Sequence, residues 1–276
     1  MDVAVGHRVV VGHGSQCCHF QRRVPPPGCA TVAPVSADRA DTVTALETAP
    51  ARPRAGPVRV AEVSAEGGLE DPPELPLHLA GEPGTVAVQL RTTVRRVAIG
   101  AGLARRPELL AAVRALPGLP GLATSPAGGT FVIGGPGWLG LCAVGVPPPE
   151  RGMPLDWIND SLSAWFRAAL AGFGVRAVTG RVEGGWCPGF SDVAVDGRKL
   201  AGLGYKVTRD WVVMRGMMAV APIAEDDMDL LVACHRLIGV EVVPAANTSL
   251  AEAAGAPGLG VGEVIERWRD VRTAPG

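Results

Sequence analysis

The chain has 276 residues, of which 47% are apolar and 19% charged, and its 26 basic and 27 acidic residues leave a formal net charge of −1. This charge argues against a dedicated nucleic-acid or anionic-membrane binder, because phosphate affinity requires a basic surplus. No run of about 18 apolar residues predicts a transmembrane helix, and residues 1–20 contain no continuous signal-peptide core. We therefore expect a cytoplasmic protein that binds neither nucleic acid nor membrane.

Residues 1–80 are rich in Pro, Gly, Ala and Arg and have no sustained hydrophobic period. Such a segment cannot offset roughly 1 to 2 kcal/mol of backbone entropy per ordered residue, which predicts a low-complexity, disordered N-terminal extension. Its cysteines, Cys17, Cys18 and Cys29, show no disulfide-framework spacing and, with the neighbouring histidines, match no standard zinc pattern. We expect reduced cysteines and no metal site.

Regular secondary structure is predicted from Gly84 onward. Alternating or continuous apolar runs predict strands over 85–90, 94–99, 138–146, 191–195, 198–207, 211–221 and 240–243. Helices are predicted over 109–116, from the N-cap Asp156 to Phe173, over 226–239 and over about 261–271. In the second helix an apolar stripe is expected to face the core: Ile158, Leu162, Trp165, Phe166, Ala169, Leu170 and Phe173.

These elements predict an α/β protein of the α+β type, with a mixed, largely antiparallel sheet packed with helices. Three parts are expected along the chain. The extension covers residues 1–80, a core covers residues 81–224, and a small helix-strand-helix appendage covers residues 225–276.

A hairpin is the strongest local signal, because Asp196-Gly197 tolerates the positive φ angles of a two-residue turn. If these residues form the loop, Val195 pairs with Arg198, Ala194 with Lys199, and Asp192 with Ala201. Lys199 and Asp192 then become diagonal neighbours about 7 Å apart, within reach of a long side chain.

Cys187 lies just before this hairpin, in a Gly-Trp-Cys-Pro-Gly turn. Lys199 and Lys206 are the only lysines among the 26 basic residues, which draws attention to Lys199. A nearby ammonium group favours the thiolate form of a cysteine, and the thiolate is the nucleophile in acyl transfer. The structural alternative is a small buried cysteine at a turn beside a solvated lysine.

Residues 187–202, which read CPGFSDVAVDGRKLAG, resemble the Cys-Pro-Gly, Asp, Gly-x-Lys-x-x-Gly segment of the lipoate-protein ligase and octanoyltransferase superfamily. Residues 126–132 resemble its Gly-Gly loop, and residues 136–139 resemble the Pro-Gly-Val-Leu continuation. The resemblance covers roughly residues 84–271. It is closest to the cysteine-dependent amidotransferases that move octanoyl or lipoyl groups between carrier domains.

The resemblance implies that Cys187 takes the acyl group as a thioester and that Lys199 contacts the acyl carbonyl. It implies substrate-binding roles for Gly128, Gly129, Thr130, Asp192 and Gly202. The partners implied are an acyl carrier or a glycine-cleavage H-type carrier protein, and lipoyl domains of 2-oxoacid dehydrogenase complexes. No cofactor is implied, because a thioester donor already carries an activated carbonyl.

The chain also departs from the family pattern. Ser125 or its neighbours stand where the family has an Arg, Gly134-Gly135 replaces a His-Asp or Leu-Asp pair, and Gly140 replaces an Asn. The loss of the Arg weakens a phosphate site. Two alternatives to the transferase therefore stay open: an ATP-dependent lipoate-protein ligase, and a non-catalytic paralogue that binds carrier or lipoyl domains.

Overall fold

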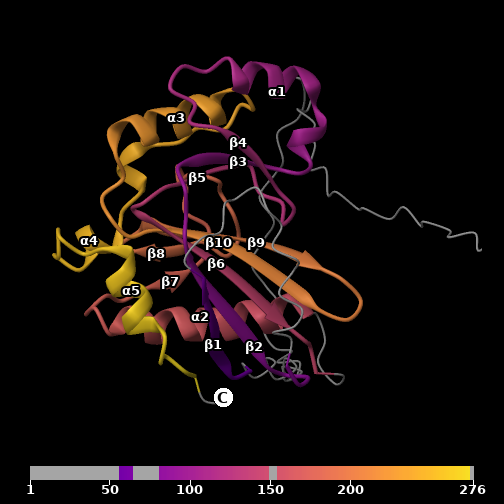
Figure 1. Cartoon of the computed structure of the whole chain (residues 1–276), viewed down its shortest axis with the longest axis vertical. Helices are drawn as coiled ribbons and strands as arrows, with labels where there is room; N and C mark the ends of the chain where they lie inside the picture. Colours follow the sequence, from indigo (N-terminus) through magenta and orange to yellow (C-terminus); the bar gives the residue numbers. More distant parts are fainter. Residues whose placement is uncertain (1–55, 65–80, 149–153, 274–276) are drawn as a thin grey trace, which may run out of the picture. The chain divides into compact units, whose positions relative to one another are not determined.

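The computed structural model describes residues 56–64, 81–148 and 154–273. Within this part of the chain, a large and a small sheet pack with helices (Figure 1). The three N-terminal cysteines considered as metal ligands lie outside the described residues. None of the helices in the described ranges has the length and hydropathy needed to cross a membrane.

The large sheet has seven strands in the order β1-β2-β6-β10-β9-β8-β7. Among the strand pairs of this sheet that the described residues form, only β1–β2 is parallel. The bounds are Val58–Ser64 for β1, Val86–Thr92 for β2, Trp138–Gly145 for β6, Val178–Thr179 for β7, Val193–Val195 for β8, Arg198–Val207 for β9 and Val212–Ala219 for β10. The predicted mixed, largely antiparallel sheet is confirmed.

The small sheet has the order β4-β3-β5, with a parallel β3–β4 pair and an antiparallel β3–β5 pair. Its strands are β3 (Arg96–Gly100), β4 (Leu122–Ser125) and β5 (Phe131–Gly134). The turn that joins β4 to β5 carries the predicted Gly-Gly loop.

In the described part of the chain, five α-helices accompany the sheets: α1 (Pro107–Arg114), α2 (Pro154–Ala171), α3 (Glu225–Arg236), α4 (Leu250–Ala253) and α5 (Val261–Trp268). Two short 3-10 turns, η2 (Leu103–Arg105) and η3 (Pro244–Ala246), complete the described elements. The four predicted helices are confirmed, but Asp156 is not an N-cap, because α2 already begins at Pro154. Proline is favoured at a first helical position, where a backbone N–H has no partner.

The predicted stripe of α2 faces the main core. Ile158, Leu162, Trp165 and Phe166 are fully buried and pack with the inward side chains of β2, β6 and β10. A second core lies beside the small sheet, where side chains of α1, α3 and β5 meet Trp138 and Trp186. Figure 1 shows α1 and α3 next to this sheet, with α2 along the large one.

Three expectations need correction. β1 lies inside the predicted extension, yet it pairs in parallel with β2. Residues 225–276 do not form a separate appendage, because their side chains belong to both cores: Leu231 of α3 lies in the second core and Trp268 of α5 in the main one. Residues 240–243 form no strand: Val243 donates a single backbone hydrogen bond to Gly184, and Pro244 then starts a 3-10 turn.

The predicted hairpin also differs in register. Val195 pairs with Arg198 and Ala194 with Lys199, as expected, but a bulge follows and places Val193, not Asp192, opposite Ala201. The extra residue, Leu200, is fully buried. A bulge bends the strand and turns side chains to new directions, and here Asp192 remains in the turn before β8.

Candidate active site

Cys187 lies in the turn between Trp186 and Pro188 with a φ angle of 45°, in the left-handed region. Few residues other than glycine adopt this region, and where they do, the surrounding contacts hold them there. The Cys187 N–H donates to His235 Nε2 at 3.0 Å, and the Cys187 carbonyl accepts from Lys199 Nζ at 2.8 Å. The thiol is half-buried, and its Sγ accepts from the backbone N–H of Thr130 at 3.2 Å.

Lys199 lies on β9 and forms an ion pair with Asp192, with 2.7 Å between Nζ and Oδ1. Both side chains are fully buried, and the ammonium also lies 4.4 Å from the centre of the Trp186 ring. Burial lowers the pKa of Lys199 and raises the pKa of Asp192, while the attraction between the two charges opposes both shifts. Asp192 is held in turn by the Gly189 N–H, 3.2 Å from Oδ2.

His235, at the end of α3, contacts both the Cys187 turn and Thr130, which follows the Gly-Gly loop. Its Nδ1 lies 2.7 Å from the Leu231 carbonyl, and its Nε2 lies 2.8 Å from the Thr130 hydroxyl. A carbonyl can only accept and the Cys187 N–H can only donate, so the imidazole proton is on Nδ1 and Nε2 accepts. Burial lowers the pKa of His235 to about 4, which keeps the ring neutral.

The Gly-Gly loop approaches the sulfur closely. Gly128 and Gly129 have φ angles of 81° and 87°, which favour glycine. A Cβ at Gly129 would lie 3.0 Å from Cys187 Sγ, whereas a Cβ at Gly128 would meet nothing within 4 Å. Glycine at 129 therefore leaves room for the sulfur and for a group bound to it.

A cavity of about 390 Å³ opens at this point, between the outer face of the large sheet and the loops that carry Cys187 and Gly129. Cys187, Gly128, Gly129 and Gly202 all line it. Lys199, Asp192 and Thr130 do not. Gly202 separates the cavity from the lysine, since a Cβ there would lie 3.2 Å from Lys199 Nζ.

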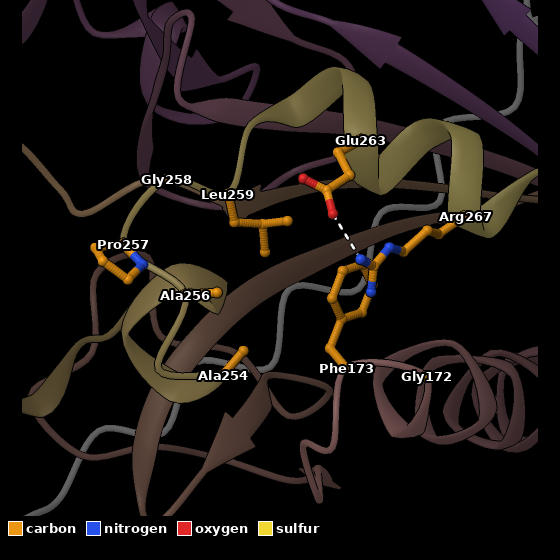
Figure 2. Close-up of a pocket in the computed structure, with 9 residues that line it drawn as sticks. All are labelled: Gly172, Phe173, Ala254, Ala256, Pro257, Gly258, Leu259, Glu263 and Arg267. Atoms are coloured by element: carbon orange, nitrogen blue, oxygen red, sulfur yellow. Dashed lines mark hydrogen bonds and ion pairs between the residues drawn. The ribbon is translucent and has the colours of Figure 1, made fainter.

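A second hollow of about 450 Å³ lies between the end of α2 and α5 (Figure 2). Figure 2 shows the Arg267 guanidinium over the Phe173 ring, with Glu263 beside it. Arg267 Nη2 and Glu263 Oε1 are 2.6 Å apart, so the charges of the two side chains neutralise each other. The described residues that line this hollow include no cysteine, histidine or lysine, so none of the predicted site residues lies there.

The predicted site residues thus come together around one turn. Lys199 contacts Cys187 through the Cys187 carbonyl. The lysine is fully buried, so the structural alternative of a solvated lysine is wrong. His235 was not among the predicted site residues. Its signal was available, because His235 is the only histidine after residue 80.

Comparisons with known proteins bear on this arrangement. A model of the lipoyl protein ligase A/B catalytic domain matches residues 114–271, more than half of the chain. The chain is 32% identical over 170 residues to an Octanoyl-[GcvH]:protein N-octanoyltransferase of Kyrpidia tusciae, covering 57% of this chain and 58% of the relative. It is 24% identical over 159 residues to the protein of that name from Geobacillus kaustophilus, covering 54% and 56%.

The chain therefore spans just over half the length of these two relatives. Among solved structures, lipoate-protein ligase A bound with ATP superposes with a TM-score of 0.53 at 15% identity, over 78% of this chain and 82% of that one. At this identity the superposition shows a shared fold and nothing further.

Proposed function

The chain belongs to the lipoyl protein ligase A/B catalytic domain family, and we propose that it is an acyltransferase of protein lipoylation. It would pass an octanoyl or lipoyl group through a Cys187 thioester to a lysine of a lipoyl domain. The observation that carries the proposal is the half-buried Cys187 thiol, which lines the cavity beside Gly129 and accepts a hydrogen bond from the Thr130 N–H.

In the first step the Cys187 thiolate attacks the thioester carbonyl of an acylated carrier. The carrier C–S bond breaks, and the carrier leaves as a thiolate that takes up a proton. The Thr130 N–H donates a hydrogen bond to Cys187 Sγ, and the Lys199 ammonium attracts a negative charge on Cys187.

In the second step the neutral ε-amine of an acceptor lysine attacks the Cys187 thioester. An amide forms, the amine loses a proton, and Cys187 leaves as a thiolate. Because His235 binds both the Cys187 N–H and the Thr130 hydroxyl, we propose that it is a positioning residue, which keeps the Thr130 N–H aimed at the sulfur through both steps.

The relatives are named for an octanoyl-GcvH donor, which supports an H-type carrier protein as the donor here, with an acyl carrier protein as the other candidate. Lipoyl domains of 2-oxoacid dehydrogenase complexes are the proposed acceptors. A thioester is already activated, so the proposed reaction needs no ATP or other cofactor.

Intact-protein mass spectrometry tests this function. The full chain is incubated with an octanoyl thioester and no ATP, and we expect an octanoyl adduct that is absent in Cys187→Ser and retained in Cys234→Ala. Cys234 is buried in the second core, so it is a matched control. A lipoyl domain added afterwards should gain the octanoyl group.

Two other outcomes contradict the proposal. Adenylate formation from free lipoate and ATP, with no adduct from the thioester, would indicate an ATP-dependent ligase. Binding of a lipoyl domain that is unchanged in Cys187→Ala and Lys199→Ala, with no acyl transfer by the unsubstituted protein, would indicate a non-catalytic binding protein.

A further inference from the structure

Arg215 of β10 lines the floor of the cavity that contains Cys187. On the large sheet it lies between Cys142 of β6 and Gly204 of β9, which are its two pairing partners. Its Nε and Nη2 are buried and, among the residues that the structure describes, have no hydrogen-bond partner. Buried donors of a charged group are rarely left in this state, because losing their hydrogen bonds is costly. Arg215 is therefore sensitive to whatever fills the cavity beside it.

Arg91 of β2 lies on the same part of the floor. A Cβ at Gly140 would lie 3.0 Å from Arg91 Cγ and 3.5 Å from Arg91 Nε, so the Arg91 side chain lies across Gly140 towards the centre of the sheet. Burial raises the pKa of the Cys142 thiol, and the charges of Arg91 and Arg215 both oppose this shift. Two guanidinium groups therefore lie near Cys142, at one end of the cavity floor.

Much of the remaining cavity lining is apolar. Met217 pairs with Gly202 on the floor, and the other large apolar side chains that line the cavity include Val132, Trp186 and Leu203. Such walls favour a hydrocarbon chain, because each methylene buried against them is removed from water. The cavity thus offers an alkyl chain an apolar path that leads from the sulfur and ends at the guanidinium group of Arg215.

The length of this path matches a chain of eight carbons. Lys199 Nζ is 2.8 Å from the Cys187 carbonyl oxygen and would lie 3.2 Å from a Cβ at Gly202, so Cys187 lies close to Gly202. Arg215 is opposite Gly204, which is two residues further along β9. Two residues of strand and one strand spacing, about 7 Å and about 5 Å, give a path of about 8 to 9 Å. An extended eight-carbon chain, built from C–C bonds of about 1.5 Å, is about 9 Å long.

Resting on the proposed function, we propose that Arg215 is a specificity-determining residue that limits the acyl group carried by Cys187 to about eight carbons. A longer alkyl chain would cover the guanidinium group with hydrocarbon, which accepts no hydrogen bond from Nε or Nη2 and cannot solvate the charge. Octanoyl and lipoyl groups both meet the limit, because the main chain of each has eight carbons.

The first experiment measures acylation of Cys187 in the full chain by octanoyl and decanoyl N-acetylcysteamine thioesters, using intact-protein mass spectrometry. In a wholly apolar cavity the two added methylenes would strengthen binding. We expect instead that the decanoyl donor reacts about tenfold or more slowly. Arg215→Met should make decanoyl at least as fast as octanoyl, whereas Arg215→Lys, which keeps a positive charge, should retain part of the preference. Equal rates in the unsubstituted protein, or an unchanged preference in Arg215→Met, would overturn the proposal.

Lys206→Met is the matched control. Lys206 lies opposite Val213 in the pairing of β9 with β10, is exposed, and does not line the cavity. This substitution also removes one positive charge from the sheet, and the preference for octanoyl should persist. Loss of the preference in Lys206→Met as well would show a general effect of net charge and would contradict the assignment to Arg215. The donors carry no phosphate, so anion binding cannot produce the preference.

The second experiment separates this inference from the proposed function. Isothermal titration with N-methyloctanamide and N-methyldecanamide, which are neutral and unreactive, requires no chemistry at the sulfur. Tighter binding of the octanamide to the unsubstituted protein, with the order reversed in Arg215→Met, supports the limit on chain length even if no acyl transfer occurs. Equal or tighter binding of the decanamide to the unsubstituted protein overturns it even if octanoyl transfer is observed, and this measurement needs no variant to fold.

Discussion

The ammonium of Lys199 and a carboxylate oxygen of Asp192 are 2.7 Å apart, and neither side chain has any exposed surface. This pair lies directly beneath the turn that carries Cys187, because Lys199 also donates to the Cys187 carbonyl. The geometry of the thiol therefore depends on a buried ion pair.

The first prediction concerns this pair. Lys199→Met should lower the free energy of unfolding by about 3 to 5 kcal/mol, because it leaves the Asp192 carboxylate buried without a counter-charge. Adding Asp192→Asn should restore much of the loss. Urea denaturation of both single variants and the double variant measures the coupling, and strictly additive losses would show that the two groups do not interact.

The second prediction compares neighbouring glycines. Gly128→Ala and Gly129→Ala should each cost about 1 kcal/mol of stability, since both residues have positive φ angles. Only Gly129→Ala places a Cβ 3.0 Å from Cys187 Sγ, so it alone should slow acylation, by about tenfold or more. Acylation rates from mass spectrometry check this, and equal slowing in both variants would contradict it.

The third prediction concerns pH and His235. Burial lowers the pKa of His235 to about 4 in the folded state, against an ordinary value of 6.5. As the pH falls, the His235 side chain therefore becomes protonated in the unfolded state at a higher pH than in the folded state. The contribution to stability is fully present above about pH 6.5 and is lost as the pH falls towards 4, by roughly 3 kcal/mol in total.

Denaturant titrations at several pH values measure this contribution. His235→Gln retains an acceptor for the Cys187 N–H but does not titrate, so its stability should fall less between pH 6.5 and 4. Identical pH profiles for the two proteins would show that His235 is not buried in neutral form.

The fourth prediction concerns thiol reactivity. Near neutral pH, iodoacetamide should modify Cys187 well before Cys142 and Cys234, which are buried. Burial raises the pKa of the Cys142 thiol and raises that of Cys234 to about 11. Peptide mapping by mass spectrometry assigns each modified residue.

The role of Lys199 in this reactivity is tested with the same reagent. Modification of Cys187 should be slower in Lys199→Met than in the unsubstituted protein, under conditions in which circular dichroism shows both to be folded. Equal rates would remove electrostatic activation by Lys199 from the mechanism.

The fifth prediction concerns the C-terminal helix. Trp268 is fully buried and packs edge-on against Trp165, with 5.1 Å between ring centroids. Trp268→Ala should lower the free energy of unfolding by about 3 to 5 kcal/mol. Glu266→Ala, on the exposed face of the same helix, should change it by less than about 0.5 kcal/mol; comparable losses would show that α5 is not part of the core.

Local patterns in the sequence predicted much of the fold. The stripe from Ile158 to Phe166 predicted the buried face of α2, and the apolar run at 138–146 predicted the buried strand β6. Residues 240–243 show the limit of such patterns. A short run rich in valine does not form a strand unless the edge of another strand lies beside it for backbone pairing.

The sequence also predicted part of the candidate site. Asp196-Gly197 predicted the hairpin, and the hairpin brought Lys199 towards Asp192 even though the bulge at Leu200 changed the register. The sequence singles out His235 as the only histidine after residue 80, but it does not place this residue beside Cys187, because the two are 48 residues apart and no short-range rule relates them.

The sequence by itself determined the helices, most strands and the hairpin, and it singled out Cys187 as the candidate nucleophile, because these follow from hydrophobic period, turn chemistry and local motifs. Only the tertiary structure decided which groups meet at the thiol and which line the cavity. Arg91 and Arg215 are far apart along the chain, and they converge because β6 lies between their strands and Gly140 leaves room for the Arg91 side chain. Their neighbourhood depends on strand pairing across the sheet, which no local pattern in the sequence specifies.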